Sequence, residues 1–249
     1  SLMLRELEKI VRQAGDIILT HYDKYDIDIN IKKDGSPVTK ADLDSEKYIK
    51  SQLENYFRFP IVTEESPVSY EDRKNWTKFW LIDPLDGTED FIKKNNEFAI
   101  NIALIENSKP IIGVVFAPAL NLLYTSELNK GSKKNGKRIY NNSQRKKIIA
   151  AESRQNSTNA TKKFLSKNNI SKVIRLGSSL KLCALAEGKI DIYPRFNGTK
   201  EWDTAAAHIV CNEAGCKVLD IETNKELIYN KESIKNNFFI ASRKDLSYL

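Results

Sequence analysis

Few side chains of this 249-residue chain are of the kinds that build disulfide frameworks, zinc sites or histidine-based catalytic centres. The three cysteines, Cys183, Cys211 and Cys216, are odd in number and form no C-x-x-C pair. This argues against a disulfide framework and against a zinc site, so we expect reduced, mostly buried thiols. His21 and His208 are the only histidines, so neither a histidine-rich metal site nor a Ser-His-Asp triad assembles easily. Chemistry in this chain must therefore rest on carboxylates.

Long apolar segments are also missing. No run approaches the ~20 apolar residues that a membrane-spanning helix needs, and charges recur near the N-terminus where a signal peptide would be apolar. Met3 is the only methionine, and we expect Ser1 and Leu2 to be remnants of expression. With 41% hydrophobic residues the chain can still bury a proper core. We expect a cytoplasmic protein, with peripheral association with the inner membrane and the choice between monomer and homodimer left open.

The excess of basic residues raises the question of nucleic-acid binding. The formal net charge is +7 and the pI is near 9.1, and counterion release makes any basic surface attractive to phosphates. The lysines are scattered, however, and the densest patches lack interleaved aromatic residues for base stacking: residues 130–137 and 145–147. We interpret them as solvated surface and expect no nucleic-acid partner, and a basic RNA-binding module remains the non-enzyme alternative.

The order of predicted elements divides the chain into two halves. Residues 1–146 begin with an amphipathic helix over Leu4–Ile18 and continue with an antiparallel meander over residues 98–126. Residues 147–249 alternate strands and helices. We expect residues 131–136 to form a loop and residues 228–229 a short strand. The prediction is an α/β (α+β) protein in which both halves form one compact unit with the site between them, most of the metal ligands coming from the first half.

The stretch from Phe79 to Phe91 is the most informative part of the sequence. An apolar strand ends at Asp83, because Pro84 has no N–H to donate to a continuing ladder. Asp83, Asp86 and the Leu85 carbonyl can then converge, an all-oxygen environment suited to Mg²⁺, Ca²⁺ or Mn²⁺. Gly87 leaves room for a ligand. Thr88 is a good N-cap for residues 89–93, and a helix start beside a hard cation is a phosphate site.

An ordinary turn that uses Asp, Pro and Gly is the alternative interpretation of this stretch. Other acidic residues bear on the choice. Asp42 resembles the acid of a capping box with Thr39, yet it shares the stripe that its helix should bury with Glu46, so we expect its carboxylate to point inward. Such a carboxylate needs a partner or a function.

Two further acidic positions have alternative interpretations. Asp203 is suited to be the N-cap of a helix that ends near Glu213, or it is a metal ligand from the second half. Glu64 and Glu65 follow a short strand, and we expect one of these adjacent loop acids to be solvated.

Three motifs together resemble the inositol monophosphatase superfamily of Mg²⁺-dependent, lithium-sensitive phosphatases: Glu64–Ser66, Asp83–Thr88 and Trp202–Ala206. They occur in the right order over nearly the whole chain, which makes the match specific. The resemblance implies a layered α-β-α-β-α sandwich of the inositol monophosphatase and fructose-bisphosphatase type. Within the superfamily, two parts of the chain resemble the CysQ-type 3'(2'),5'-bisphosphate nucleotidases. They are Gly177–Lys181, and Ala186–Gly188 running into Tyr193–Phe196.

The resemblance implies roles for individual residues. Two or three Mg²⁺ ions would be held by Glu64, Asp83, the Leu85 carbonyl, Asp86 and Asp203. Asp42 and Thr88 would orient and deprotonate the attacking water, with Glu64 as the third catalytic residue. The substrate would be bound by Asp86, Gly87, Thr88, Lys181, Tyr193, Arg195 and Asp203. Lithium would inhibit.

The choice of substrate depends on whether a second anion site exists. Lys181 and Arg195 are suited to hold one, and Tyr193 or Phe196 to offer a flat surface for adenine; a solvent-facing lysine and core packing are the alternatives. The prediction is hydrolysis of the 3'-phosphate of 3'-phosphoadenosine 5'-phosphate to AMP and phosphate. An inositol monophosphatase is the alternative enzyme.

Overall fold

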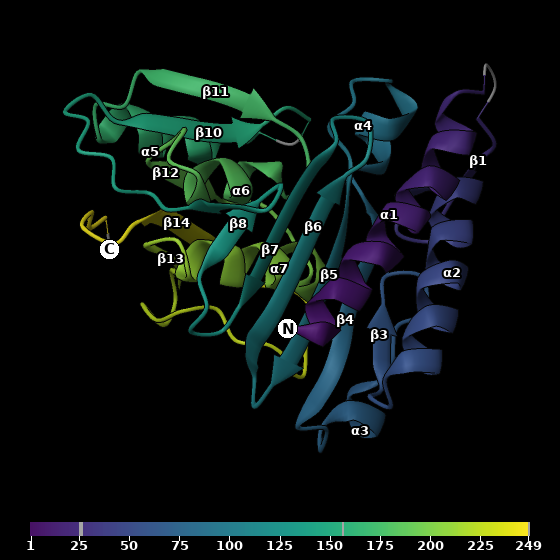
Figure 1. The fold of residues 1–249 in the computed structure, drawn as a ribbon. Coiled ribbons are helices and arrows are strands. Elements are labelled where there is room, and N and C mark those ends of the chain that lie inside the picture. The colour runs from purple at the N-terminus through teal and green to yellow at the C-terminus, as the bar shows by residue number, and fades with distance from the viewer. Residues whose placement is uncertain (25–26, 156, 249) are drawn as a thin grey trace.

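Two β-sheets, separated and covered by helices, make up the structure, a computed structural model that describes residues 1–24, 27–155 and 157–248 (Figure 1). The first sheet has the order β3-β4-β5-β6-β7-β8-β9, in which only the β3–β4 pair is parallel. Its strands are β3 (Ile61–Thr63), β4 (Lys78–Asp86), β5 (Ala99–Glu106), β6 (Lys109–Ala117), β7 (Leu122–Glu127), β8 (Ser132–Lys134) and β9 (Lys137–Ile139). The predicted meander is therefore the centre of this sheet.

The second sheet has the order β11-β10-β12-β14-β13, with parallel pairing on both sides of β10 and antiparallel pairing elsewhere. Its strands are β10 (Ile149–Ser153), β11 (Lys172–Leu176), β12 (Ile192–Arg195), β13 (Cys216–Asp220) and β14 (Phe239–Arg243). The alternation predicted from residue 147 onward is present, because α5 (Asn159–Lys167) and α6 (Leu180–Ala186) connect the parallel strands.

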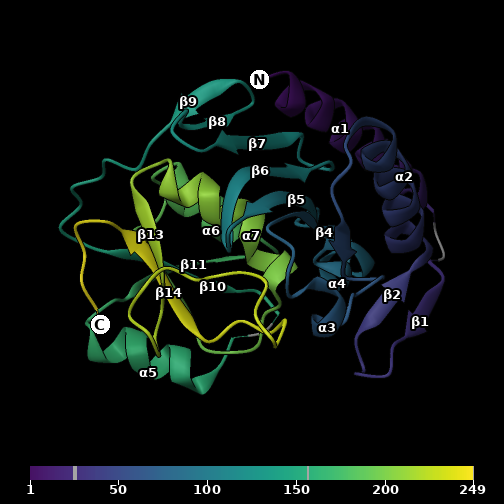
Figure 2. The ribbon, with the colours of Figure 1, turned by 90° about the horizontal axis from the view of Figure 1, so that it is seen from below.

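Helices cover and separate the sheets to give five layers (Figure 2). The outer face of the first sheet packs on α1 (Leu2–Tyr22) and α2 (Lys40–Tyr56), whose buried stripes join the residues of β4 to β7 in one apolar cluster. Between the sheets lie α6 and α7 (Glu201–Asn212), in a second cluster with the inner faces of both. A third cluster joins α5 to the outer face of the second sheet. The layered α-β-α-β-α prediction is confirmed.

Four short elements complete the fold, and the structure corrects two of the expectations about strands. The hairpin of β1 (Ile29–Ile31) and β2 (Pro37–Thr39) precedes α2, while α3 (Tyr70–Arg73) and α4 (Thr88–Ile92) flank β4. Residues 131–136, expected to be a loop, contain β8, which pairs with β7. The strand expected at residues 228–229 is absent from the described structure there, where only an isolated bridge joins Leu219 to Glu226. None of the helices described is long and apolar enough to cross a membrane.

Candidate active site

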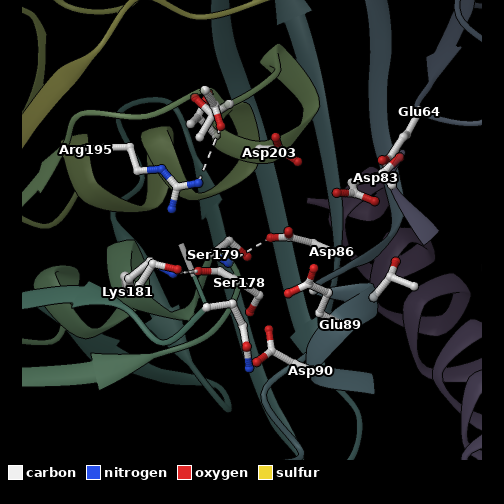
Figure 3. Close-up of a pocket in the computed structure, with 18 of the residues that line it drawn as sticks. Glu64, Asp83, Asp86, Glu89, Asp90, Ser178, Ser179, Lys181, Arg195 and Asp203 are labelled. Carbon is white, nitrogen blue, oxygen red and sulfur yellow. Dashed lines mark hydrogen bonds between the residues drawn. The ribbon is translucent and has the colours of Figure 1, made fainter. Parts of the chain in front are cut away.

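A cavity of about 340 Å³ opens where the end of β4, the starts of α6 and α7, and strand β12 meet. Both halves of the chain line it, and the loop of the β1–β2 hairpin contributes Gly35, Ser36 and Pro37. The labelled acidic side chains of Figure 3 come from the end of β3, from β4 and from α4 on one side of this space and from α7 on the other. We refer to it as the cleft.

Strand β4 brings two acidic residues to the cleft by means of a β-bulge. The ladder with β5 pairs Asp83 with Asn101 and Asp86 with Ala99, so β4 has one extra residue between the two pairs. Pro84 lies in the bulge, where a missing N–H costs no ladder hydrogen bond. The prediction that the strand ends at Asp83 is thus wrong by three residues, because the bulge lets the pairing resume at Asp86. The Leu85 N–H donates to Asp83 Oδ1 (3.1 Å) and stabilises the turn of the backbone.

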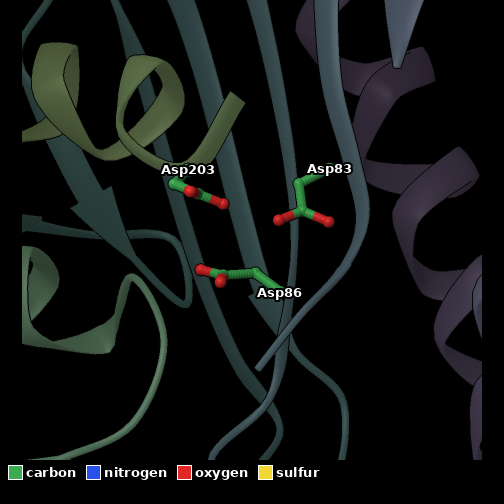
Figure 4. A group of neighbouring side chains, drawn as sticks. All are labelled: Asp83, Asp86 and Asp203. Carbon is green, nitrogen blue, oxygen red and sulfur yellow. The ribbon is translucent and has the colours of Figure 1, made fainter. Parts of the chain in front are cut away.

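A third aspartate comes from α7. Asp203 is the third residue of that helix, and its Oδ2 accepts a hydrogen bond from the Lys200 N–H (2.7 Å). Of the two interpretations of Asp203, this placement excludes the N-cap, since the N-cap is Lys200 and Asp203 folds back on it, and leaves the metal-ligand role. Ligand oxygens of Asp83, Asp86 and Asp203 all lie within 4.8 Å of one another (Figure 4). The structure therefore brings together acids that are far apart in the sequence.

The electrostatics of this group favour a cation. Burial, and then the charge of Asp203, raises the pKa of Asp86 to about 7. Burial, followed by the charges of Glu64 and Asp86, raises the pKa of Asp83 above its usual range. The groups that donate to Asp86 are neutral, namely Asn101 Nδ2 (3.2 Å) and the Ser179 N–H (2.8 Å). Carboxylates that repel one another and offer only oxygen ligands fit a hard divalent cation such as Mg²⁺.

Glu64 and Glu65 separate into two environments. The Glu64 side chain lines the cleft and lies beside Asp83 (Figure 3), and burial, then the charge of Asp203, raises its pKa to about 8. It falls outside the group of three aspartates. The Glu65 side chain is only 7% exposed and pairs with Lys32 Nζ at 2.8 Å. The Glu64 side chain is 27% exposed, so the expectation that one of these acids is solvated is met in part, with Lys32 Nζ at 3.5 Å from Glu64.

Asp42 and Thr88 are hydrogen-bonded beside the cleft. Asp42 is 1% exposed, so its predicted inward orientation is confirmed, and burial raises the pKa of its carboxyl group. Its Oδ2 accepts from the Thr39 N–H (2.9 Å) and hydroxyl (2.6 Å), which completes the predicted capping box. Its Oδ1 accepts from the Thr88 hydroxyl at 2.8 Å.

Thr88 is the first residue of α4, and the N-cap is Gly87, at φ +86°. The expectation that Thr88 is the N-cap is corrected, and its hydroxyl is engaged with Asp42 instead. A side chain at Gly87 would strain the backbone, and its Cβ would lie 2.9 Å from Asp90 Oδ2 and 3.2 Å from Ser178 Cβ. Glycine is required there by conformation and by space.

Two cationic side chains border the same cleft. Lys181 is only 2% exposed, which excludes the solvent-facing alternative; its Nζ donates to the carbonyls of Leu176 (3.1 Å) and Ser178 (2.9 Å). Burial, and then the charge of Arg195, lowers the pKa of Lys181 to about 7. Arg195 donates to the Tyr193 hydroxyl (3.1 Å), while its buried Nε has no hydrogen-bond partner among the residues that the structure describes.

The two aromatic candidates differ in position. Tyr193 lines the cleft but is 4% exposed, since its ring packs on Phe239 and under Lys181 Nζ. Phe196 packs against Phe164 and Phe238 on the other face of the second sheet. Phe196, the residue after β12, is thus partly buried against the third cluster and does not line the cleft.

Sequence reasoning missed the residues that hold Asp86 in place. Ser179 donates its N–H to Asp86 and its hydroxyl to Asn101 Oδ1 (2.7 Å), while Asn101 donates to Asp86 from β5. The signals were present in the sequence. Asn101 is the polar residue among the apolar residues 99–105 of β5, and Ser179 lies in the Gly177–Lys181 motif.

Comparison with known proteins agrees with this geometry. The model of the inositol monophosphatase family matches residues 2–246. The chain belongs to the inositol monophosphatase family. The 3'(2'),5'-bisphosphate nucleotidase CysQ of Escherichia coli (strain K12) is 40% identical over 246 residues, covering 96% of this chain and 99% of the relative. The corresponding CysQ of Haemophilus influenzae is 32% identical over 248 residues, covering 96% of this chain and 91% of the relative.

Solved structures of the family superpose closely. CysQ from Bacteroides thetaiotaomicron has a TM-score of 0.87 and 35% identity, covering 98% of this chain and 97% of that one. The Thermotoga maritima IMPase has a TM-score of 0.82 and 27% identity, covering 97% and 92%. The predicted membership of the inositol monophosphatase family is thereby confirmed over nearly the whole chain.

Proposed function

We propose that this protein is a Mg²⁺-dependent phosphatase that hydrolyses the 3'-phosphate of 3'-phosphoadenosine 5'-phosphate to give AMP and inorganic phosphate. One observation carries the proposal. A single cleft is bordered by three converging aspartates and by the basic side chains of Lys181 and Arg195. A substrate with two separate phosphates uses both features, whereas a monophosphate needs only the first. The names of the CysQ relatives support the same substrate.

The donor set for the metal ions follows from the cleft. Glu64, Asp83, the Leu85 carbonyl, Asp86 and Asp203 would hold two or three Mg²⁺. When bound, the ions supply charge neutralisation for the phosphate oxygens, activation of water and stabilisation of the leaving oxygen. Li⁺, which would compete for the same oxygens, is expected to inhibit.

The protein groups supply the proton path and the orientation. Because the Thr88 hydroxyl donates to Asp42, its oxygen can accept a proton from a water held beside it. As that water attacks phosphorus, its proton moves to the Thr88 oxygen and the Thr88 proton moves to the Asp42 carboxylate. The P–O bond to the 3'-oxygen breaks, and the leaving oxygen takes a proton from a solvent water to become the hydroxyl of AMP, while Asp42 returns its proton to solvent and is ready for the next turnover.

The phosphates would be bound at two places in the cleft. The N–H groups of Gly87 and Thr88, which have no partner within α4, would hold the scissile phosphate. Arg195 and Lys181, which both line the cleft, would bind the 5'-phosphate, and the Tyr193 hydroxyl would orient the Arg195 guanidinium.

Phosphate release from 3'-phosphoadenosine 5'-phosphate and from inositol 1-phosphate, measured side by side, tests the proposal. With Mg²⁺ the nucleotide should be hydrolysed with the higher kcat/KM, and EDTA should abolish release from both. A preference for inositol 1-phosphate would make the protein an inositol monophosphatase. Absence of Mg²⁺-dependent release from either substrate would contradict the proposal as a whole.

A further inference from the structure

Helix α2 presents three buried polar side chains to the loops that carry the acids of the cleft. Asp42, Ser45 and Glu46 are 1%, 0% and 8% exposed. Asp42 holds Thr88, and the Ser45 hydroxyl donates to the Pro84 carbonyl (2.8 Å) in the bulge of β4. Glu46 lies one turn after Asp42 and reaches a different segment, the loop of Glu64 and Glu65. The proposed mechanism assigns no role to Glu46.

Glu46 closes a ring of hydrogen bonds around that loop. Its Oε1 accepts from the Thr63 hydroxyl (2.5 Å) and from the Ser66 hydroxyl (2.5 Å). The Ser66 N–H in turn donates to Thr63 Oγ1 (2.8 Å). A carboxylate only accepts, so both hydroxyls must donate to it, and the Thr63 oxygen remains free to accept the N–H. Each group in the ring therefore has one orientation, and the two residues before and after the acids are tied together.

Within this ring lie two adjacent acids, Glu64 and Glu65, of which only one faces the cleft. Glu64 faces the cleft, and Glu65 is turned away and buried beside Lys32. Lys32 alone does not determine which acid faces the cleft, since its Nζ lies 2.8 Å from Glu65 and 3.5 Å from Glu64. The charge of Lys32 attracts either carboxylate and would be satisfied by Glu64 as well as by Glu65. What distinguishes them is the direction of the backbone between Thr63 and Ser66.

We propose, building on the proposed function, that Glu46 is a positioning residue that directs Glu64 into the cleft and thereby sets the affinity for Mg²⁺. Glu46 is not among the residues that line the cleft or among the acids that converge there, and its Oε1 is directed at Thr63 and Ser66 instead. It acts as the outer partners of metal ligands do: they orient the ligand, and their loss typically costs about 10-fold to 100-fold in metal affinity.

Titration calorimetry with Mg²⁺ alone, on the parent and on Glu46→Ala, measures this effect directly. Glu46→Ala should raise the Mg²⁺ Kd about 10-fold or more. Glu46→Gln should lie close to the parent, because its amide oxygen can still accept both hydroxyl groups. Ser66→Ala and Thr63→Val each remove one donor and should give intermediate values. These two milder variants carry the test if Glu46→Ala does not fold.

A matched control separates positioning from general stability. Asp191 is another fully buried carboxylate, paired with Arg145 and Arg243 at the second sheet, away from the cleft. Asp191→Asn should lower the melting temperature while leaving the Mg²⁺ Kd unchanged. A Kd of folded Glu46→Ala, Ser66→Ala and Thr63→Val equal to that of the parent would overturn the role of Glu46.

Kinetics provide a second and independent readout. If Glu46 positions Glu64, the Mg²⁺ concentration for half-maximal activity should rise in Glu46→Ala, and kcat at saturating Mg²⁺ should change only a few-fold. A large fall in kcat with unchanged Mg²⁺ affinity would contradict the proposal. A parent that binds Mg²⁺ but hydrolyses no substrate would refute the proposed function alone, because calorimetry with Mg²⁺ needs no substrate.

Discussion

Asp42 combines two functions in one buried carboxylate. One oxygen caps α2 at Thr39, and the other accepts from Thr88 at the edge of the cleft. Asparagine in this place can still accept the hydrogen bond from the Thr39 N–H through its amide oxygen. Its NH₂ group would then face Thr88 and donate, which reverses the direction of the hydrogen bond and removes the proton acceptor.

Asp42→Asn should therefore separate the two functions. We expect kcat to fall by about 10²-fold or more, while the melting temperature changes little because the cap remains. Stopped assays at saturating Mg²⁺ and thermal melting of the same preparation measure both effects. Near-normal turnover of the variant would reduce Asp42 to a helix cap.

Arg195 is the residue that tests substrate choice. Arg195→Ala should raise KM for 3'-phosphoadenosine 5'-phosphate far more than for a simple monophosphate, because only the first has an anion for this side chain. Arg195→Lys keeps the charge but loses the planar fork, so its effect should be smaller. Equal losses on both substrates would remove Arg195 from the second anion site.

For single residues, the sequence predicted which side chains belong to the site better than it predicted the direction in which they point. It predicted Asp42 inside and the acids of β4 together, because helix periodicity and an Asp-Pro-x-Asp spacing are local properties. Composition and spacing alone could not separate Glu64 from Glu65, which only the family resemblance did, since the side chains that surround the two acids come from Glu46 and Lys32, which are distant in the chain. The sequence left Tyr193 and Phe196 as alternatives for the adenine surface, because the packing of α5, which separates them, is not visible in the sequence.

The positions of the strands and helices around the site depend on close packing between the backbones of β6 and α7. Gly113 of β6 faces α7, where a Cβ would lie 2.3 Å from the Ala206 carbonyl oxygen and 2.6 Å from Ile209 Cγ2. A carbonyl in a helix cannot move aside as a flexible side chain can. The contact fixes the distance between the first sheet, which carries Asp83 and Asp86, and the helix that carries Asp203.

Gly113→Ala should consequently destabilise the protein by about 1–3 kcal/mol, the usual cost of overpacking. Chemical denaturation of the purified protein measures it. Gly198→Ala is the control, since a Cβ there meets nothing within 4 Å and should leave the free energy of unfolding nearly unchanged. Equal stability of both variants would show that α7 can shift away from β6 without cost.

Element boundaries near the cleft were the least predictable part of the fold. Thr88 and Asp203 have the composition of N-caps, yet each lies inside its helix. In both cases the side chain serves another partner, Asp42 for Thr88 and the Lys200 N–H for Asp203. The β4 bulge was hidden for a related reason, because Pro84 indicates the end of a ladder but not whether pairing resumes.

For the whole molecule, the cluster of acidic side chains in the cleft predicts how the free energy of unfolding of the metal-free protein depends on pH. The pKa values of Glu64 and Asp86 are raised to about 8 and about 7, against about 4 in an unfolded chain. Between these values the folded state binds more protons than the unfolded state, so the free energy of unfolding falls as pH rises. Lys181 opposes this only above its lowered pKa of about 7, where the unfolded lysine remains protonated.

The clearest window is therefore between about pH 5 and pH 7, below the lowered pKa of Lys181. In EDTA the melting temperature should decline as pH rises through this window. With saturating Mg²⁺ the decline should be smaller or absent, because the ion binds the ionised carboxylates and replaces the proton. A melting temperature in EDTA that rises across the window would contradict the assignment of raised pKa values to the cleft.

Asp83 allows the metal site to be tested by stability alone. At a free Mg²⁺ concentration of one hundred times Kd, binding to the native state contributes about 2.7 kcal/mol, an easily measured rise in melting temperature. Asp83 is buried beside Glu64 and Asp86, whose charges add to burial in raising its pKa. Asp83→Asn removes one of these repelling charges, so the metal-free variant should be as stable as the parent or more stable.

The same substitution should remove much of the stabilisation by Mg²⁺ and nearly all activity, since one ligand of the ions is lost. An aspartate that serves only the β4 bulge would behave in the opposite way. Its hydrogen bond to the Leu85 N–H would be weakened, so the variant would melt lower in EDTA and still respond to Mg²⁺ as the parent does. Melting curves of both proteins in EDTA and across a Mg²⁺ titration distinguish the two cases, and the second pattern would remove Asp83 from the metal site.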